Sequence, residues 1–294
     1  MEKKVGAQAW VFFALLALIW GSSFILIKRG LLAFSAMEVG ALRIVAASVV
    51  LTPFALPAFK TIKKQHIPRL LSVGLLGSFF PAFLFALAQT RLNSSVTGVL
   101  NGLTPIFVLL IGYFAFKQPI TLRSALGVLV GFGGTTLLIL AGNSSAPGEI
   151  NYYALFVVLA TFFYGLNLNV IKYYLPDLPA LAITSMSLVM VGPLSALILF
   201  GFTDFVPKLS QDPQALNSML YVVLLGVMGT AIALILFNKM VKIATPLFAS
   251  SVTYAIPVVA VIWGLFDGES LLPLQMLGMA AILLGVYIAN RKKG

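Results

Sequence analysis

The residues of this sequence that could do chemistry are aromatic and polar side chains inside long apolar segments, and the chemistry they suit is binding. Trp20 and Ser23 lie three positions apart in one segment, and Tyr164 and Asn167 repeat that spacing in another. Residues three apart share one face of a helix, so each pair presents an aromatic ring beside a small polar group. Such a face indicates the wall of a small-molecule pocket. A tight helix crossing at the glycine after each aromatic residue is the alternative interpretation.

Two further apolar segments carry a polar stripe that ends in proline. The stripes consist of Thr97, Asn101, Thr104 and Pro105 in one segment and of Ser250, Thr253, Tyr254 and Pro257 in the other. Polar side chains are costly next to lipid, so both stripes are predicted to point inward. Each proline removes a backbone hydrogen bond and bends its helix. Bends at matching places predict a paired hinge or gate, and a static kink is the other possibility.

Two residues complete the candidate pocket. Phe80 belongs to an aromatic stripe and is its member next to Pro81, and Thr230 follows a glycine in a later segment. A phenylalanine in a membrane helix also commonly faces lipid or the packed core. The predicted substrate-binding residues are Trp20, Ser23, Phe80, Asn101, Tyr164, Asn167, Thr230, Thr253 and Tyr254, and the predicted hinge or gate residues are Pro105 and Pro257.

Glu38 and Arg43 are the charged residues nearest the interior of an apolar segment. A charge at the centre of a bilayer costs about 2.5–3.5 kcal/mol on insertion scales. Glu38 stands near an expected helix start, where the helix dipole favours an acid. Five residues place Arg43 about 140° around the helix from Glu38, so Arg43 is expected to bond loop carbonyls or another helix. Both charges are predicted to be structural, and proton coupling through Glu38 is the weaker alternative.

The composition argues against several kinds of chemistry. The sequence has no cysteine and one histidine, His66, which leaves no disulfide and none of the usual His/Cys metal sites. The apolar segments carry no catalytic pair or metal motif of the kind that a membrane-embedded enzyme needs. A channel would need symmetric rings of subunits or a charged filter. We therefore predict no enzyme, no metal and no cofactor, and we read the net charge of +11 as membrane orientation rather than nucleic-acid binding.

The elements that must position these residues are membrane-spanning helices. Hydrophobic residues make up 60% of the 294 residues and charged residues only 9%, against about 25% charged residues in soluble domains. A span needs about 20 mostly apolar residues. The blocks that reach this length are Gln8–Lys28, Ser35–Ala58, Pro68–Ala88, Ser94–Phe116, Leu122–Ala141, Tyr152–Tyr173, Pro179–Phe202, Ser218–Asn238, Thr245–Phe266 and Leu274–Asn290. The predicted fold class is an all-α integral membrane protein with ten transmembrane helices.

Lysine and arginine indicate which side of the membrane holds the chain ends. When the loops are assigned to alternate sides, most of the 19 Lys and Arg residues fall on the side of the amino terminus. The opposite side carries only Lys28, Arg29, Arg91 and Lys208. Because positive charge concentrates in cytoplasmic loops, we expect both termini in the cytoplasm.

The sequence contains an internal repeat. Segment 17–28 matches segment 161–172 at an offset of 144, with an aromatic-Gly pair, a small polar residue and an Ile-Lys pair in register. The proline and glycine of the fourth block match those of the ninth at an offset of 152. Five helices per repeat is an odd number, so the second repeat begins on the opposite side. Residues 1–145 and 146–294 are therefore predicted to be inverted repeats, a transporter signature with the site near the bilayer midplane.

At these positions the chain resembles a known family. Its size and repeats are similar to those of EamA-type permeases of the drug/metabolite transporter superfamily, and the resemblance covers essentially the whole chain. The motifs that carry it are Trp20-Gly21-Ser22-Ser23-Phe24, Leu42-Arg43 and Pro105. The resemblance implies a bacterial inner-membrane exporter of amino acids, related metabolites or drugs. Family members often have a Glu-Pro pair after the fourth and ninth helices, where this sequence has Gln118-Pro119 and Glu269-Ser270.

The predicted function is secondary transport of a small organic metabolite, such as an amino acid or a drug-like compound, by alternating access around a midplane cavity. The alternative is an exchanger of phosphorylated metabolites or nucleotide sugars, which share the architecture. That alternative needs Lys28 or Lys172 to turn into the cavity, whereas lysines at helix ends ordinarily snorkel to the interface. The predicted partners are the small solute and the lipid bilayer.

Glycines leave the oligomeric state open. They line single faces of the fifth and tenth blocks, at Gly127 and Gly131 and at Gly278 and Gly285. Small residues of this kind let helices approach closely. The faces predict either packing within one chain or the seam of a homodimer, so we expect a monomer or a homodimer.

Overall fold

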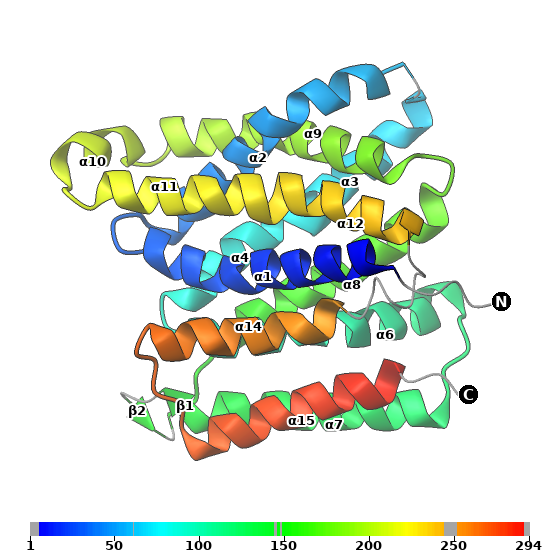
Figure 1. The fold of residues 1–294 in the computed structure, drawn as a ribbon, viewed down its shortest axis with the longest axis vertical. Coiled ribbons are helices and arrows are strands. Elements are labelled where there is room, and N and C mark those ends of the chain that lie inside the picture. The colour runs from blue at the N-terminus through cyan, green and yellow to red at the C-terminus, as the bar shows by residue number, and fades with distance from the viewer. Residues whose placement is uncertain (1–5, 61, 144–145, 148, 244–251, 291–294) are drawn as a thin grey trace.

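The computed structural model describes residues 6–60, 62–143, 146–147, 149–243 and 252–290, and these residues form a bundle of long helices (Figure 1). The helices run back and forth along one common direction. We call the end where α1 begins and α15 ends the proximal end, and the end where α1 finishes and α15 begins the distal end. The chain therefore enters and leaves the described bundle on the same side.

The elements follow the apolar blocks of the sequence. The first half contains α1 (Ala7–Gly30), α2 (Ala36–Ala58), η1 (Lys64–His66), α3 (Ile67–Gly74), η2 (Leu75–Phe79), α4 (Phe80–Gln89), α5 (Ser94–Leu100), η3 (Asn101–Leu103), α6 (Thr104–Phe116) and α7 (Leu122–Ala141). The second half contains α8 (Ala154–Tyr174), α9 (Ala180–Gly201), α10 (Phe205–Gln211), α11 (Ala215–Gly226), η4 (Val227–Ile232), α12 (Ala233–Ile243), α14 (Val252–Phe266) and α15 (Pro273–Asn290). Two short strands, β1 (Gly142–Asn143) and β2 (Ala146–Pro147), pair antiparallel between the halves.

The lengths of these helices match a membrane protein. Within the described residues, 8 helical stretches are long and apolar enough to cross a membrane, and two shorter apolar helices accompany them at Val252–Phe266 and Pro273–Ala289. The chain is an all-α, multi-pass membrane protein. Residues 245–251, which begin the ninth predicted block and include Ser250, lie outside the described residues. The arrangement of ten spanning helices in two inverted repeats stays a prediction.

The loop between α9 and α11 differs from the prediction. Residues 204–217 were expected to be a polar connector, but α10 lies within them, and α11 begins at Ala215 rather than Ser218. Phe205 explains the difference, because it is buried and its ring centroid lies 5.1 Å from that of Phe34. One buried ring anchors the first turn of α10 to the loop that follows α1.

The outer pair of helices, α7 and α15, packs side by side (Figure 1). A Cβ atom on Gly134 would lie 2.6 Å from the carbonyl oxygen of Gly278, and a Cβ atom on Gly285 would lie 2.6 Å from the carbonyl oxygen of Gly127. Backbones this close leave no room for side chains, so the glycines serve helix contact within one chain. A dimer seam would have to use another surface.

Three stretches interrupt regular α-helix in the middle of the bundle. The first is η3, a 3-10 turn directly before Pro105, which has no N–H to donate to the carbonyl of Asn101. The hydroxyl of Thr104 donates to that carbonyl at 2.9 Å instead. The other two are π-helical segments, η2 and η4, one in each half. Because π-helical turns are rare and are frequently found at functional sites, these segments direct attention to the bundle interior.

Candidate functional site

The first side of the interior is built by Trp20 and Ser23 of α1 against η4. The indole Nε1 of Trp20 donates to the carbonyl oxygen of Gly229 at 3.0 Å, and its ring centroid lies 5.6 Å from that of Phe237. The Ser23 hydroxyl donates to the carbonyl of Ile19 at 3.2 Å and is buried. A Cβ atom on Gly229 would come within 3.1 Å of that hydroxyl oxygen. The Trp20 face of α1 thus lies directly on the π-helical segment η4.

The second side is built by Tyr164 and Asn167 of α8 against η2 and α4. A Cβ atom on Gly77 of η2 would lie 2.5 Å from the amide nitrogen of Asn167. The Oδ1 atom of Asn167 is buried and, within the described part of the chain, has no hydrogen-bond partner. The Tyr164 ring stacks on Phe85 with a centroid distance of 5.9 Å and an interplanar angle of 30°. Here too the aromatic-polar face lies on a π-helical segment.

These two sides correspond in sequence. Ser23 and Asn167 are 144 positions apart, and Gly229 and Gly77, which they approach, are 152 apart. These are the offsets of the internal repeat. The correspondence means that α1 of the first half meets η4 of the second, while α8 of the second half meets η2 of the first.

The glycines after the aromatic residues make the same kind of matched contact. A Cβ atom on Gly21 would lie 2.5 Å from the Val259 Cβ in α14, and one on Gly165 would lie 2.7 Å from the Phe107 Cβ in α6. Val259 and Phe107 are again 152 positions apart. Both glycines therefore permit a tight helix crossing. The side chains of Trp20 and Asn167, beside these glycines, face the π-helical segments. Each of the helices α1 and α8 therefore carries both a tight helix crossing and a face toward the interior.

The charges near the interior have separate partners. The Arg43 guanidinium of α2 lies near the phenol of Tyr164 and interacts with it electrostatically, which relates α2 to α8. Glu38 completes a capping box with Ser35 at the start of α2, and Lys208 donates to its Oε2 at 2.7 Å. The Oε1 atom of Glu38 is buried and has no partner among the described residues. Each charge thus connects α2 to an element of the second half.

The remaining predicted residues lie at varied places. Phe80 is 40% exposed, and its ring centroid lies 5.5 Å from that of Phe163. Thr230 is half-buried in η4, and Asn101 is half-buried in η3. Thr253 and Tyr254 are half-buried in α14.

The two predicted hinge prolines lie near one another. Pro257 is inside α14, and its Cγ would lie 3.8 Å from a Cβ atom on Gly102 of η3. Pro105 follows η3 at the start of α6. The 3-10 turn η3, which precedes Pro105, therefore packs on Pro257. The two candidate hinges thus lie at one place in the bundle.

A polar cluster at the distal end was not predicted from the sequence. The Glu269 carboxylate accepts hydrogen bonds from the backbone N–H groups and hydroxyls of Ser94 and Ser95 at 2.7–3.0 Å, and from Lys28 Nζ at 2.8 Å. Lys28 also pairs with Asp267 at 2.6 Å. We call Lys28, Ser94, Ser95, Asp267 and Glu269 the distal charge cluster. The expectation that Lys28 merely snorkels is corrected: its ammonium is held by two carboxylates. The sequence does show the acid Glu269 after the ninth block, but the serines that bind it, Ser94 and Ser95, lie 175 and 174 positions earlier in the chain.

The cluster has a defined charge state. Burial alone would raise the pKa of the Glu269 carboxyl, but hydrogen bonds from Lys28, Ser95 and Ser94 outweigh it and hold that pKa below its ordinary value of 4.5. The carboxylate also lies at the amino-terminal end of α5, where the helix dipole favours an anion. Glu269 is therefore an anion that ties the start of α5 to the ends of α1 and α14.

The interior site offers groups suited to binding a small molecule. In the described parts of the chain, no three or more His, Cys, Asp or Glu side chains gather as a metal site requires. The sole histidine, His66, accepts from the backbone N–H of Lys63 and lies 3.2 Å from Asp177 at the proximal end. The interior supplies aromatic rings, an orphaned amide oxygen and π-helical backbone.

Comparison with known proteins places the chain in a family. The sequence model described as the EamA-like transporter family matches residues 8–140 and 151–291. An uncharacterized transporter of Archaeoglobus fulgidus is 27% identical over 290 residues, which is 97% of this chain and 100% of that protein. The uncharacterized inner membrane transporter YedA of Escherichia coli is 24% identical over 299 residues, which is 96% of this chain and 91% of YedA. A crystal structure aligns over 96% of both chains with a TM-score of 0.62 and 19% identity, which shows the fold alone. With two matched halves and helices built to span a membrane, the chain belongs to the EamA-like transporter family and is a membrane transporter.

Proposed function

We propose that this protein is a secondary transporter that moves a small organic solute by alternating access between two inverted five-helix repeats, residues 1–145 and 146–294. The proposal is supported by the matched contacts of Ser23 with Gly229 and of Asn167 with Gly77. Contacts related by a repeat place equivalent groups on two sides of one interior space. Inverted repeats around a central site allow the two halves to rock about the solute.

The observation that carries the proposal is the orphaned Oδ1 atom of Asn167. It is buried beside η2 and has no partner among the described residues. An unsatisfied buried polar group costs about 1–3 kcal/mol, and each such group in a native structure calls for an explanation. A bound solute that donates a hydrogen bond to this oxygen supplies one. Tyr164, one turn away on the same face, supplies the ring on which that solute packs.

The interior suits a neutral or zwitterionic solute, such as an amino acid or a drug-like compound. Arg43 lies beside the phenol of Tyr164 and keeps its positive charge there, which suits the single carboxylate of a zwitterionic solute. Phosphorylated metabolites or nucleotide sugars carry more negative charge and would need Lys28 or Lys172 in the cavity as well. Lys28 is held by Asp267 and Glu269, and Lys172 lies 5.1 Å from the ring centroid of Tyr173. These contacts favour the amino-acid class over the phosphate class.

The proposed substrate site is the set predicted from sequence, with Trp20, Ser23, Tyr164 and Asn167 at its centre. Asn101, Thr253, Tyr254, Thr230 and Phe80 are proposed as further lining residues in the states that the transporter visits. Pro105 and Pro257 are proposed as the paired hinge. The proposed setting is a bacterial inner membrane with both termini cytoplasmic, and export as the direction.

Flux measurements in proteoliposomes test this function. The purified chain is reconstituted and assayed against a panel of amino acids and aromatic drug-like compounds. We expect saturable flux of at least one solute and a loss of at least tenfold in the Trp20→Ala and Asn167→Leu variants. Trp10→Ala is the matched control, because Trp10 is 57% exposed on the same helix and should keep full flux. Absence of saturable flux for every solute, or equal loss in the Trp10 variant, would overturn the proposal.

A further inference from the structure

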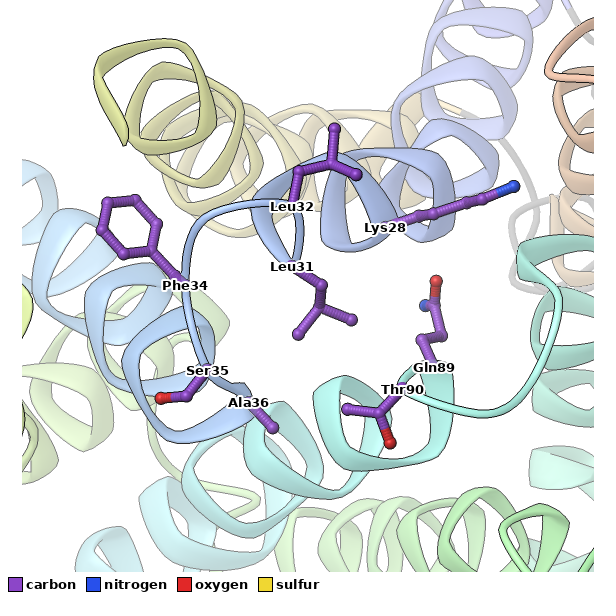
Figure 2. A pocket seen from close by; sticks show the side chains of 8 residues that line it. All are labelled: Lys28, Leu31, Leu32, Phe34, Ser35, Ala36, Gln89 and Thr90. Carbon is purple, nitrogen blue, oxygen red and sulfur yellow. The ribbon is translucent and has the colours of Figure 1, made fainter. Parts of the chain in front are cut away.

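A pocket at the distal end lies outside the proposed interior site. It has a volume of about 330 Å³ and is formed by the end of α1, the loop before α2 and the end of α4. Figure 2 shows Leu31 in the middle of the pocket, the Phe34 ring at one side, and Gln89 and Lys28 together at the other. Pockets that hold small ligands begin at about 300 Å³, so the space admits more than a single water molecule.

Gln89 is the unexplained residue of this pocket. Its side chain is 7% exposed, and neither its Nε2 nor its Oε1 atom has a hydrogen-bond partner in the described part of the chain. A glutamine amide offers two donors and one acceptor. Leaving both kinds of group unpaired is more costly than leaving one. The amide rises from the end of α4 into the pocket wall beside Lys28 (Figure 2).

The charges around the pocket are already balanced. Lys28 pairs with Asp267 and Glu269, and Arg29 pairs with Asp267. A charged ligand would therefore meet no free counter-charge there. The other lining residues are the apolar Leu31, Leu32, Phe34 and Ala36, together with Ser35 and Thr90, whose hydroxyls already bond the backbone of Glu38 and Leu87. The pocket thus combines an apolar body with one unsatisfied amide and no net charge.

We propose that this pocket binds a small neutral solute that has an apolar body and a carboxamide headgroup. The headgroup pairs with Gln89, because a carboxamide carries a donor and an acceptor side by side and so matches both orphaned atoms. The apolar body lies against Leu31, which stands in the middle of the pocket (Figure 2). A rotation of the Gln89 side chain, which is flexible about its three torsions, brings the amide from the wall to the ligand. Because the pocket touches Lys28, its occupant lies beside the distal charge cluster.

Binding to the purified full-length protein in detergent tests the proposal, with 4-methylpentanamide as the probe. Methyl 4-methylpentanoate has the same apolar body but no N–H donor, and 4-methylpentanoate is the charged analogue. We expect saturable binding of the amide and at least tenfold weaker binding of the ester and of the carboxylate. Equal binding of all three compounds, or of none, would overturn the proposal and leave water as the occupant.

Variants connect the binding to Gln89. Gln89→Met removes the orphaned amide, so it should weaken amide binding at least tenfold and raise the melting temperature of the empty protein. Gln65→Met is the matched control, since Gln65 is exposed at the proximal end, and it should change neither quantity. Loss of binding with a lower melting temperature would assign Gln89 a structural role and overturn the proposal. The Trp20→Ala and Asn167→Leu variants should still bind the probe, which separates this site from the proposed transport site.

Discussion

Two helix ends in this protein are each followed by a residue of left-handed backbone conformation and differ in the side chain that comes next. α6 ends in the left-handed residue Lys117 with φ 53°, and α14 is followed by Gly268 with φ 77°. The next residue is Gln118 in the first case and Glu269 in the second. The backbone N–H of Gln118 donates to the carbonyl oxygen of Gly112 at 3.0 Å, and the backbone N–H of Glu269 donates to that of Gly264 at 2.9 Å. The two turns lie at opposite ends of the bundle, so they give a direct comparison of those ends.

The side chains make these two ends different. Glu269 is buried and ties Lys28 to the start of α5 through Ser94 and Ser95. Gln118 is half-buried, and its side-chain amide lies beside Gly112, near the end of its own helix. Similar backbone turns therefore produce a charged cross-link at the distal end and a local contact at the proximal end.

The ion pairs are distributed unevenly between the two ends of the bundle. Of the ion pairs within the described parts of the chain, all but His66–Asp177 lie at the distal end. On the proposed mechanism, each end must open in turn. On that mechanism the distal charge cluster would hold the distal end closed, and opening that end would require the cluster to separate.

Removal of Glu269 should produce the largest effect. Glu269→Ala leaves the amino-terminal N–H groups of α5 without their acceptor and leaves Lys28 with Asp267 as its remaining carboxylate. Breaking a buried ion pair costs about 3–5 kcal/mol, and because Lys28 is a third exposed we expect about 3 kcal/mol and a clear fall in melting temperature. Gln118→Ala, the matched change at the proximal end, should cost less than about 1 kcal/mol.

The same variant should open the distal end selectively. The chain has no cysteine, so single cysteines can be placed at buried Val96, near the start of α5, and at buried Ile111, near the end of α6. Glu269→Ala should speed maleimide labelling at position 96 and leave labelling at 111 unchanged or slower. Equal acceleration at both positions would mean general unfolding, and no acceleration would contradict the assigned closing role.

Gly264 and Gly112 accept the hydrogen bonds that close these two turns, and we expect a methyl group added at each to destabilise the protein by different amounts. A Cβ atom on Gly264 would overlap the hydroxyl of Ser95 and the carboxylate of Glu269, whereas one on Gly112 would lie 3.2 Å from the flexible Gln118 side chain. Overpacking costs about 1–3 kcal/mol, so Gly264→Ala should lower the melting temperature strongly and Gly112→Ala only slightly. Similar losses in thermal melts of the two variants would show that the ends are packed alike.

The helix positions and the internal correspondence of this protein can be predicted from its sequence. The apolar blocks predicted most helices to within a few residues, because a span must be about 20 residues long and its polar connectors are short. The offsets of 144 and 152 anticipated that Trp20 and Tyr164 would occupy corresponding faces. The length of the apolar segments and the spacing of the repeated motifs are therefore enough to predict these two features.

Other features depend on packing that no local pattern encodes. Glu269 meets Ser94 across 175 positions, and Trp20 donates to the carbonyl of Gly229 in the π-helical segment η4, 209 positions away. Gln89 is a single polar residue at the end of an apolar helix, and its missing partners become evident only when α1 and α4 are in place. Sequence analysis missed all three for the same reason: the decisive neighbour is distant in the chain.

The pH dependence of stability should originate at the distal end. The folded state holds the pKa of the Glu269 carboxyl below its ordinary value of 4.5, so this group stabilises the fold at pH values above 4.5. The contribution is lost as the pH falls from 4.5 through the lowered pKa of the folded protein. Thermal melts across this acid range should show a steeper loss for the native chain than for Glu269→Gln. Identical slopes would show that Glu269 is not the titrating group.

The proximal ion pair should give the smallest effect. Asp177 is 54% exposed, so its attraction to His66 is screened by water, and exposed pairs of this kind contribute about 0–1 kcal/mol. Asp177→Asn should therefore shift the melting temperature little and leave labelling at positions 96 and 111 unchanged. A loss as large as that of Glu269→Ala would mean that charge closes both ends, and the asymmetry between the two ends would have to come from packing instead.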